Sequence, residues 1–223
     1  MEFTLWFYNL KLYKYKSLQN LWHVLDMIVN QRIYCARWSE LNDPLEGRYE
    51  IYLGSKGTRI EGLMVGRIEK AKNNYRVASL SADPNNFLLW SHYADGHKGV
   101  ALEIDIPEGH KDLLKVTYSP FSSVFTDKLQ TQEDMRHLFN AKGEEWTYEK
   151  EYRLVVPRKF FRLPKPIVRV FLGPRVSEDQ RKVLSAIVPS HVEIFQTELD
   201  RVQGTLEVAN PNPSLQRTAS GGR

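Results

Sequence analysis

The sequence predicts an α+β fold: a single domain over residues 1–208, with a largely antiparallel, strongly twisted sheet flanked by helices. A split of that sheet into two halves is one option. Short runs of alternating apolar and polar residues, the period of a half-buried strand, recur along the chain. Amphipathic segments with helical spacing of apolar residues interrupt them. A polar stretch rich in Gly, Pro and Ser marks residues 209–223 as a tail that we expect to be disordered.

Local patterns predict the elements of the first half in chain order. Residues 10–15 alternate between apolar and polar, and Ser17 is a good N-cap for a helix over 18–30, whose apolar side chains recur at helical spacing. A second strand is expected at 32–36. Residues 41–44 form a turn, because a proline disfavours helical geometry at the residue before it. We then expect a strand at 49–53, a helix at 60–74, a strand at 75–81 and a helix at 87–93.

The second half continues the same mixture. Residues 99–105 alternate cleanly, and we expect 113–118 to be their antiparallel neighbour. A helix over 133–142 precedes the segment 146–156, whose β-branched end and following proline favour a strand. The remaining elements are a buried strand at 167–172, a capped amphipathic helix at 177–187 and a last strand at 192–195.

Composition bounds the kind of protein. The net charge of +4 and the isoelectric point near 9.0 permit an anionic ligand or a nucleic acid without requiring one. The most basic segment, 158–165, is interleaved with apolar residues, and a solvated loop between strands explains it equally well. The lone Cys35 excludes an internal disulfide, and we expect a buried, inert thiol. With no signal-peptide pattern and no long apolar stretch, a cytoplasmic, bacterial-type protein without membrane contact is expected.

The segment Trp146–Arg153 holds the strongest candidate for a site. As a strand it places Glu149, Glu151 and Arg153 in one row on one face, with aromatic side chains opposite. Like charges side by side are costly unless a partner pairs with them. Arg153 is one such partner and a bound ligand is the other. The row is therefore either a self-paired, solvated face or part of a site.

Other polar residues could join this row. His92 is either a general base or a structural histidine, because imidazole titrates near neutral pH. Asn42 and Asp43 form either a tight turn or the polar mouth of a cleft, with Glu46 close in sequence. A metal-dependent hydrolase would need Asp43, Glu46, His92 and both glutamates to converge on a hard cation, which their spacing does not demonstrate. We therefore predict no metal ligand set.

Several of these motifs occur in one order along the chain. They are Leu12-Tyr13-Lys14-Tyr15, Leu41-Asn42-Asp43-Pro44-Leu45-Glu46, Ser79-Leu80-Ser81, Trp90-Ser91-His92-Tyr93-Ala94-Asp95-Gly96-His97-Lys98-Gly99-Val100 and Trp146-x-Tyr148-Glu149-x-Glu151-Tyr152-Arg153. Together they resemble the bacterial domain-of-unknown-function family numbered 2971, over about residues 10 to 200. That resemblance implies a common fold and supplies no activity.

The same order resembles, more distantly, that of the mono-ADP-ribosyltransferases. Those enzymes use a residue on an N-terminal strand, then a Ser-x-Ser strand, then a Glu-x-Glu or a lone Glu on a later strand. Here Tyr15 or Lys14, Ser79-x-Ser81 and Glu149-x-Glu151 fall in that order. The resemblance implies that NAD is a substrate and that the serine hydroxyls orient the bound nucleotide.

The resemblance also implies a role for Glu151. Its carboxylate would hold a ribose hydroxyl and stabilise oxocarbenium-like charge as nicotinamide leaves. A basic residue near the first strand would meet the pyrophosphate. The Arg or His that those transferases usually carry on the first strand is absent, and this chain has Lys11, Lys14 and Tyr15 there.

We therefore expect a cleft lined by polar side chains, with catalytic roles for Glu151, Glu149 and His92. Its nucleotide-binding residues would be Tyr15, Asn42, Asp43, Ser79, Ser81 and Arg153. The first hypothesis is an ADP-ribosyltransferase-like, NAD-processing enzyme, with a role as a toxin or in phage defence and with a protein or nucleic-acid acceptor left open. The second is a non-catalytic ligand-binding or regulatory module. The third is a metal-dependent nuclease or phosphodiesterase.

Overall fold

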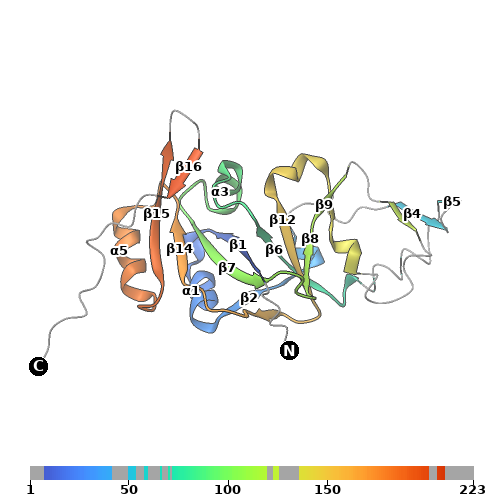
Figure 1. Ribbon diagram of the computed structural model, residues 1–223, viewed down its shortest axis with the longest axis horizontal. Helices are drawn as coiled ribbons and strands as arrows, with labels where there is room; N and C mark the ends of the chain where they lie inside the picture. The colour runs from blue at the N-terminus through green and yellow to red at the C-terminus, as the bar shows by residue number, and fades with distance from the viewer. Residues whose placement is uncertain are drawn as a thin grey trace, which may run out of the picture.

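The computed structural model describes residues 8–41, 50–53, 58–59, 66, 70, 72–119, 123–125, 136–200 and 205–208. A mostly antiparallel, curled sheet with flanking helices confirms the predicted α+β fold (Figure 1). The strands follow the order β16-β15-β14-β7-β1-β6-β12-β8, and β3 also pairs with β6. They are β1 (Asn9–Lys16), β3 (Ala36–Arg37), β6 (Arg76–Ser81), β7 (Val100–Pro107), β8 (Leu113–Lys115), β12 (Glu151–Val156), β14 (Arg169–Leu172), β15 (Glu193–Asp200) and β16 (Thr205–Val208).

One face of the sheet is apolar and covered by helices. Strand alternation directs Leu12, Leu102 and Leu154 to this face, and none of the three is exposed to solvent. The helices α1 (Leu21–Asn30) and α5 (Glu178–Ile187) pack their apolar sides against it. Burial of such side chains is worth roughly 1.5–3 kcal/mol each before the entropy of ordering them is subtracted. This layer is therefore the main core.

The opposite face is shared between aromatic and polar side chains. Helix α3 (Phe87–Tyr93) lies over it and inserts Trp90, which is fully buried and meets the Tyr15 ring edge-on at a centroid distance of 5.2 Å. The indole N–H of Trp90 donates to the carbonyl of Pro84 at 2.8 Å, so its polar atom is satisfied. The rest of this face, towards β6 and β12, carries the polar residues considered below.

The helices predicted at 18–30, 87–93 and 177–187 are confirmed, and their caps explain where they begin. Ser17 accepts the amide of Gln19 ahead of a short 3-10 turn (Leu18–Asn20) and α1. The Asn86 side chain accepts the first amides of α3. Ser177 and Gln180 form a reciprocal capping box at α5.

The sheet narrows between β1 and β6. Strand β1 pairs with β7 along its whole length, from Asn9–Pro107 to Lys16–Val100. With β6 it shares one partner pair, Tyr13–Ser81. The Lys14 ammonium lies in the opening and donates to the Ser79 carbonyl at 2.7 Å, which satisfies a backbone group left without a strand partner. The two halves of the sheet are thus joined by a narrow seam.

The expectation of a strand throughout 146–156 is wrong in its first part. Residues Glu144–Glu149 form a 3-10 helix, η5, which Lys150 ends in the left-handed region at φ 45°. Local hydrogen bonds, from Trp146 to Gly143 and from Lys150 to Thr147, compete with strand pairing there. Strand β12 begins only at Glu151.

Two further expectations fail because of long-range pairing. Residues 113–118 divide into β8 and β9 (Thr117–Tyr118), and β8 pairs with β12 instead of with 99–105. Strand β7 has no edge left for them, since β1 and β14 occupy both. Where a helix over 133–142 was expected, the described part holds a 3-10 turn, η4 (His137–Phe139), and β11 (Ala141–Lys142), which pairs with β9.

The predicted strand at 32–36 is interrupted. Its first part, β2 (Arg32–Tyr34), pairs with β13 (Phe160–Arg162) in a separate two-stranded ribbon, while β3 joins the main sheet. Between them Cys35 is fully buried, as expected, and its amide donates to the Lys159 carbonyl. Burial raises the pKa of the Cys35 thiol to about 11, which keeps it protonated and unreactive.

The remaining strands form a small sheet. The strand predicted at 49–53 is present as β4 (Glu50–Leu53), which pairs with β5 (Thr58–Arg59) and with β10 (Ser123–Phe125). The helix expected at 60–74 falls largely outside the described residues, and so does the tail at 209–223. Within the described ranges, no helix combines the length and apolar character needed to cross a membrane.

A close approach at Gly99 provides a test of the packing of α3 against β1. A Cβ at Gly99 would collide with the carbonyl oxygen of Lys16 and with the Ala94 backbone. Gly99→Ala should therefore lower the free energy of unfolding by about 2 kcal/mol, as overpacking does. Gly66→Ala is the control, since a Cβ there meets nothing within 4 Å. Urea denaturation measures both, and equal stability of the two variants would contradict the close approach.

Candidate functional site

The polar face of the sheet brings three of the predicted motifs into one row. Register sets Tyr13 of β1 opposite Ser81 of β6, and Ser81 opposite Glu151 of β12. The next row along the same strands pairs Ser79 with Arg153. Because facing residues of antiparallel strands share a face, these side chains point to the same side of the sheet. The motifs that are far apart in sequence are therefore neighbours in space.

Glu151 lies at the centre of a buried ion-pair network. Its carboxylate accepts from Nε and Nη2 of Arg153 at 2.8 and 3.0 Å, and from Nζ of Lys142 at 3.2 Å. Ser79 faces Arg153 across the strand pair, beside the same carboxylate. Only 2% of Glu151 and none of Arg153 is exposed. Arg153 also donates to the Phe139 carbonyl at 2.7 Å, so its orientation is set from two sides.

Glu149 joins the same network from η5. The Tyr93 hydroxyl donates to its Oε1 at 2.8 Å, and Lys142 donates to its Oε2 at 2.6 Å. Lys142 therefore bridges the two carboxylates, and its ammonium also lies 4.7 Å from the centre of the Trp146 ring. Lys142 and Arg153 are together the partners that the two carboxylates require.

The environment pushes the pKa values of the two carboxylates apart. Burial alone would raise the pKa of Glu151, but the Arg153 guanidinium, aided by Lys142, outweighs burial and lowers that pKa to about 2. Burial raises the pKa of Glu149, with the Lys142 ammonium opposing the rise. Glu151 is consequently a permanent anion near neutral pH, and Glu149 is the member of the pair that takes up a proton more readily.

Ser81 and Tyr15 organise the backbone beside the network. The Ser81 hydroxyl donates to the Glu149 carbonyl at 2.6 Å and accepts the Asp83 amide at 3.0 Å. The Tyr15 hydroxyl donates to the Asp83 carbonyl at 2.6 Å. Ser81 thus ties the turn at Asp83 to the end of η5, Tyr15 ties it to β1, and burial raises the pKa of the Tyr15 phenol.

The structure does not bring every expected residue to this place. His92 is exposed on α3, with its ring 6.3 Å from that of Tyr93, and among the described residues that ring makes no hydrogen bond to either carboxylate. Asn42, Asp43 and Glu46 fall outside the described residues. The residues brought together are Ser79, Ser81, Glu149, Glu151 and Arg153, with Tyr15 beside them on β1.

Sequence reasoning missed two participants of the network. Lys142 precedes the glutamates in a short strand that was expected to be helix, and nothing in its local sequence marks it as their partner. Tyr93 was not among the predicted site residues, although its hydroxyl donates to Glu149. Lys14, a candidate from the sequence, fills the seam between β1 and β6, where burial, with Lys16 as a second cause, lowers its pKa to about 7.

The described residues offer no metal site. No group of three or more His, Cys, Asp or Glu side chains in them is arranged to hold an ion. The two glutamates already contact cationic side chains, which compete directly with a metal ion.

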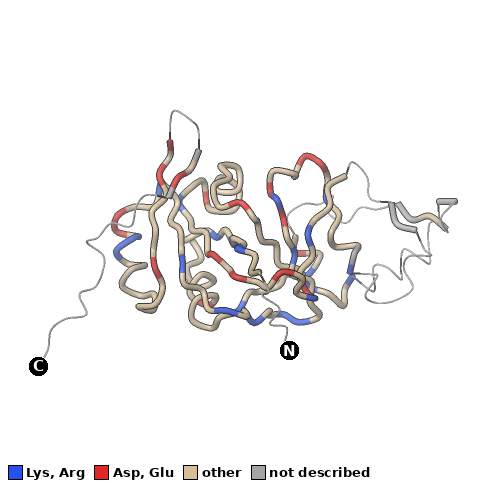
Figure 2. Tube along the Cα trace, viewed as in Figure 1, with Lys and Arg blue, Asp and Glu red and all other residues tan. Residues whose placement is uncertain are grey.

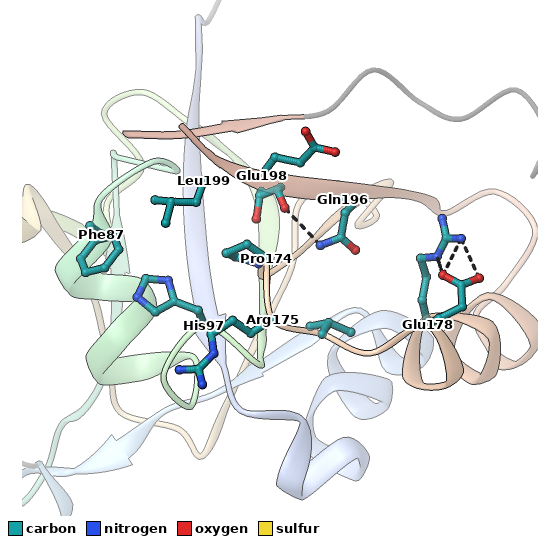
Figure 3. A pocket seen from close by; sticks show the side chains of 11 residues that line it. Phe87, His97, Pro174, Arg175, Glu178, Gln196, Glu198 and Leu199 are labelled. Carbon is teal, nitrogen blue, oxygen red and sulfur yellow. Dashed lines mark hydrogen bonds and ion pairs between the residues drawn. The ribbon is translucent and has the colours of Figure 1, made fainter. Parts of the chain in front are cut away.

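A separate cavity of about 750 Å³ lies between α3, β15 and the segment that follows β14 (Figure 3). The rings of Phe87 and His97 stand together at one end, with centroids 4.3 Å apart, and the Glu178–Arg181 ion pair stands at the other. His97 is buried, and its Nδ1 has no hydrogen-bond partner within the described residues. Strands β7, β1 and β6 separate this cavity from Glu151 in the sheet.

Comparison with known proteins places the network within a recognised segment. A family model described as "Protein of unknown function (DUF2971)" matches residues 89–154. The matched segment begins in α3 and ends in β12, so it contains Tyr93, Lys142, both glutamates and Arg153. No curated protein and no solved structure matches the chain. The similarity supports the family resemblance and assigns no activity.

Removal of the Arg153 guanidinium tests how much the ion-pair network contributes to the free energy of unfolding. Arg153→Met leaves the Glu151 carboxylate buried without its bidentate partner, so we expect a loss of about 3–5 kcal/mol in the free energy of unfolding. Glu151→Leu combined with Arg153→Met removes both charges and should recover part of that loss. The exposed pair of Lys150 with Asp83 provides the control: Lys150→Gln should cost less than about 1 kcal/mol. Equal losses for Arg153→Met and Lys150→Gln in urea denaturation would rule out a buried network.

The contributions of Glu149 and Glu151 to the free energy of unfolding should change in opposite directions with pH. The Glu151 pKa falls from 4.5 to about 2 on folding, so its contribution is full above pH 4.5 and is lost as the pH falls towards 2. The gap in unfolding free energy between wild type and Glu151→Gln should therefore narrow in acid. Folding raises the pKa of Glu149, so wild type loses stability relative to Glu149→Gln as the pH rises above 4.5. The free energy of unfolding of Glu149→Gln should therefore increase relative to that of wild type over this range. Chemical denaturation at a series of pH values measures both, and parallel curves for the two variants would contradict these assignments.

Proposed function

We propose that the protein is an ADP-ribosyltransferase-like enzyme that processes NAD, with Glu151 as its essential carboxylate. The observation that carries this proposal is the row across β1, β6 and β12, in which Tyr13, Ser81 and Glu151 are direct neighbours. It sets the N-terminal strand, the Ser-x-Ser strand and the glutamate strand side by side and pointing to one face. The narrow seam between β1 and β6 lies at the same place.

The charge state of Glu151 determines what it can do. A carboxylate with a pKa of about 2 has no proton to give at neutral pH, so general acid catalysis is excluded for it. A fixed anion can instead stabilise the positive charge that develops on the ribose as the C1′–N bond of NAD breaks. Nicotinamide leaves with the bonding electron pair, an acceptor oxygen or nitrogen attacks C1′, and the acceptor's proton passes to solvent or to a base. The two hydrogen bonds from Arg153 keep the carboxylate in place for this role.

The packing around Glu151 sets a condition for turnover. Lys142 covers the carboxylate from β11 and contacts Oε2, while Arg153 reaches it from the neighbouring strand position. A ribose hydroxyl must therefore take the place of the Lys142 ammonium at Oε2. Lys142 can withdraw towards Glu149, which it already contacts at 2.6 Å, without leaving an unpaired buried charge.

The first strand offers a group for the pyrophosphate. Lys11 is on the same face of β1 as Tyr13, and 47% of its side chain is exposed. Its ammonium is 3.1 Å from the Glu103 carboxylate. A bound diphosphate would take the place of Glu103 and bind the ammonium more strongly. Lys11 is therefore our candidate for the basic residue that would meet the pyrophosphate.

Release of nicotinamide from NAD tests the proposal. Wild type should release nicotinamide, measured by chromatography, and Glu151→Gln should reduce the rate at least 100-fold because it removes the fixed charge. Lys11→Ala should raise KM more than it lowers kcat. Lys182→Ala, an exposed change on α5, is the control for charge alone. If NAD neither stabilises the wild type thermally nor yields nicotinamide, the proposal fails.

A second candidate, a non-catalytic ligand-binding module, is favoured by two observations. All four carboxylate oxygens of Glu149 and Glu151 already have protein partners. The cavity beside His97 also has the volume of a small-molecule site. On this alternative NAD stabilises wild type and Glu151→Gln equally, and neither yields nicotinamide, so the same assay separates the two functions.

A further inference from the structure

The ribbon formed by β2 and β13 presents a surface that the NAD chemistry does not use. Its register pairs Phe160 with Tyr34, Phe161 with Ile33, and Arg162 with Arg32. The central pair is buried, with Phe161 2% and Ile33 1% exposed. Because strand side chains alternate, the two flanking pairs point outward together. The outer face of the ribbon is therefore an arginine pair beside an aromatic pair.

The aromatic pair is presented to solvent. Tyr34 is 41% exposed, and its ring meets that of Phe160 at a centroid distance of 5.9 Å. The Arg32 guanidinium lies 3.9 Å from the centre of the Phe160 ring, and the Lys159 ammonium lies 5.4 Å from it. Aromatic faces flanked by cations provide both stacking surface and positive charge.

Cations outnumber carboxylates around this ribbon. Figure 2 shows Lys and Arg positions recurring along the lower edge of the molecule, where β2 runs in Figure 1. The exposed or half-exposed cations are Arg32, Arg37, Arg158, Lys159, Arg162 and Lys165. The carboxylates among them are Asp26, which pairs with Arg32, Asp112, which pairs with Arg158, and Glu40, which accepts from the Tyr34 hydroxyl and the Arg37 amide.

Three of these cations have no ion pair within the described residues. Lys159, Arg162 and Lys165 make no contact of 4.0 Å or less with a carboxylate there. Arg162 stands directly across from Arg32, whose guanidinium already pairs with Asp26. An anion bound on the outer face would give the three other cations a partner.

We propose that this ribbon binds single-stranded nucleic acid. Phosphates would lie on Lys159, Arg162 and Lys165, and bases would stack on Tyr34 and Phe160, the combination that sequence-tolerant single-strand binders use. Ile33 and Phe161 point inward, and the outward Tyr34 and Phe160 rings are flanked by cations, so the ribbon offers no aliphatic side chain for insertion into a lipid surface. Exposed aromatic rings are not needed to contact the outer phosphates of a duplex. The surface therefore fits unpaired bases better than a membrane or a duplex.

Fluorescence anisotropy with labelled oligo-U and oligo-dT of about 12 nucleotides, within the usual range of single-strand site sizes, tests this proposal on the full chain. Lys159→Gln with Arg162→Gln should weaken binding at least tenfold at low salt. The slope of log affinity against log salt should fall by about 1.4, which is about 0.7 for each phosphate that is no longer neutralised. Phe160→Leu keeps an apolar side chain in the ribbon and should weaken binding about fivefold with the slope unchanged. Lys182→Gln on α5 should change neither quantity, and thermal melts establish that every variant is folded.

Several outcomes would overturn the proposal. Wild type that does not bind either oligonucleotide, or a double variant that binds as tightly as wild type, would show that the ribbon is not a nucleic-acid surface. If heparin and a duplex of the same length displace the oligonucleotide equally well, and Phe160→Leu has no effect on binding, the ribbon is a non-specific polyanion site. Binding to phosphatidylserine vesicles that the double variant loses, without oligonucleotide binding, would assign it to membranes. Nicotinamide release is expected to be the same in all these variants, so failure here is distinguishable from failure of the proposed enzymatic function.

Discussion

The Lys142 ammonium between two buried carboxylates is the constraint on which the polar half of the molecule depends. Moving these charges out of water costs several kcal/mol each, and only close pairing with further hydrogen bonds offsets that cost. The pairing requires β11, η5, β12 and α3 to converge, since Lys142, Glu149, Glu151 and Tyr93 come one from each. A local contact geometry thus determines the relative placement of four segments.

Much of the fold was predictable because it depends on periodicity within each segment. Alternation directs Leu12 and Leu102 to the covered face and Ser79 and Arg153 to the other, as any strand of this composition would. The contact between Glu151 and Arg153 follows from the same rule, since residues two apart share a face. Capping residues such as Ser177 mark helix starts through hydrogen bonds to amides only three residues away.

The missed features depend on partners that lie outside the segment whose pattern was considered. Glu149 leaves the strand because the hydroxyl of Tyr93 and the ammonium of Lys142 hold it at the end of a 3-10 helix, and neither partner is visible in residues 146–153. Residues 113–118 pair with β12 because both edges of β7 are occupied by strands from elsewhere in the chain. His92 and Tyr93 are adjacent in sequence, so the local pattern does not distinguish them. The orientation of α3 on the sheet brings Tyr93 to the Glu149 carboxylate and leaves His92 exposed. Local pattern contains no information on any of these choices.

The two charged regions of the molecule illustrate opposite consequences of burial. Inside the network, desolvation makes an unpaired charge so costly that every glutamate oxygen has a donor, and the geometry is rigid as a result. On the ribbon, water and salt screen the charges, so Arg162 can stand across from Arg32 at a small cost in stability. A rigid anion suits stabilisation of a transient positive charge, which must meet it in one position. A screened surface of solvated cations suits a flexible polyanion, whose phosphates exchange readily with counterions. The two proposed functions therefore use opposite physical properties, a buried fixed charge in one region and exposed screened charges in the other.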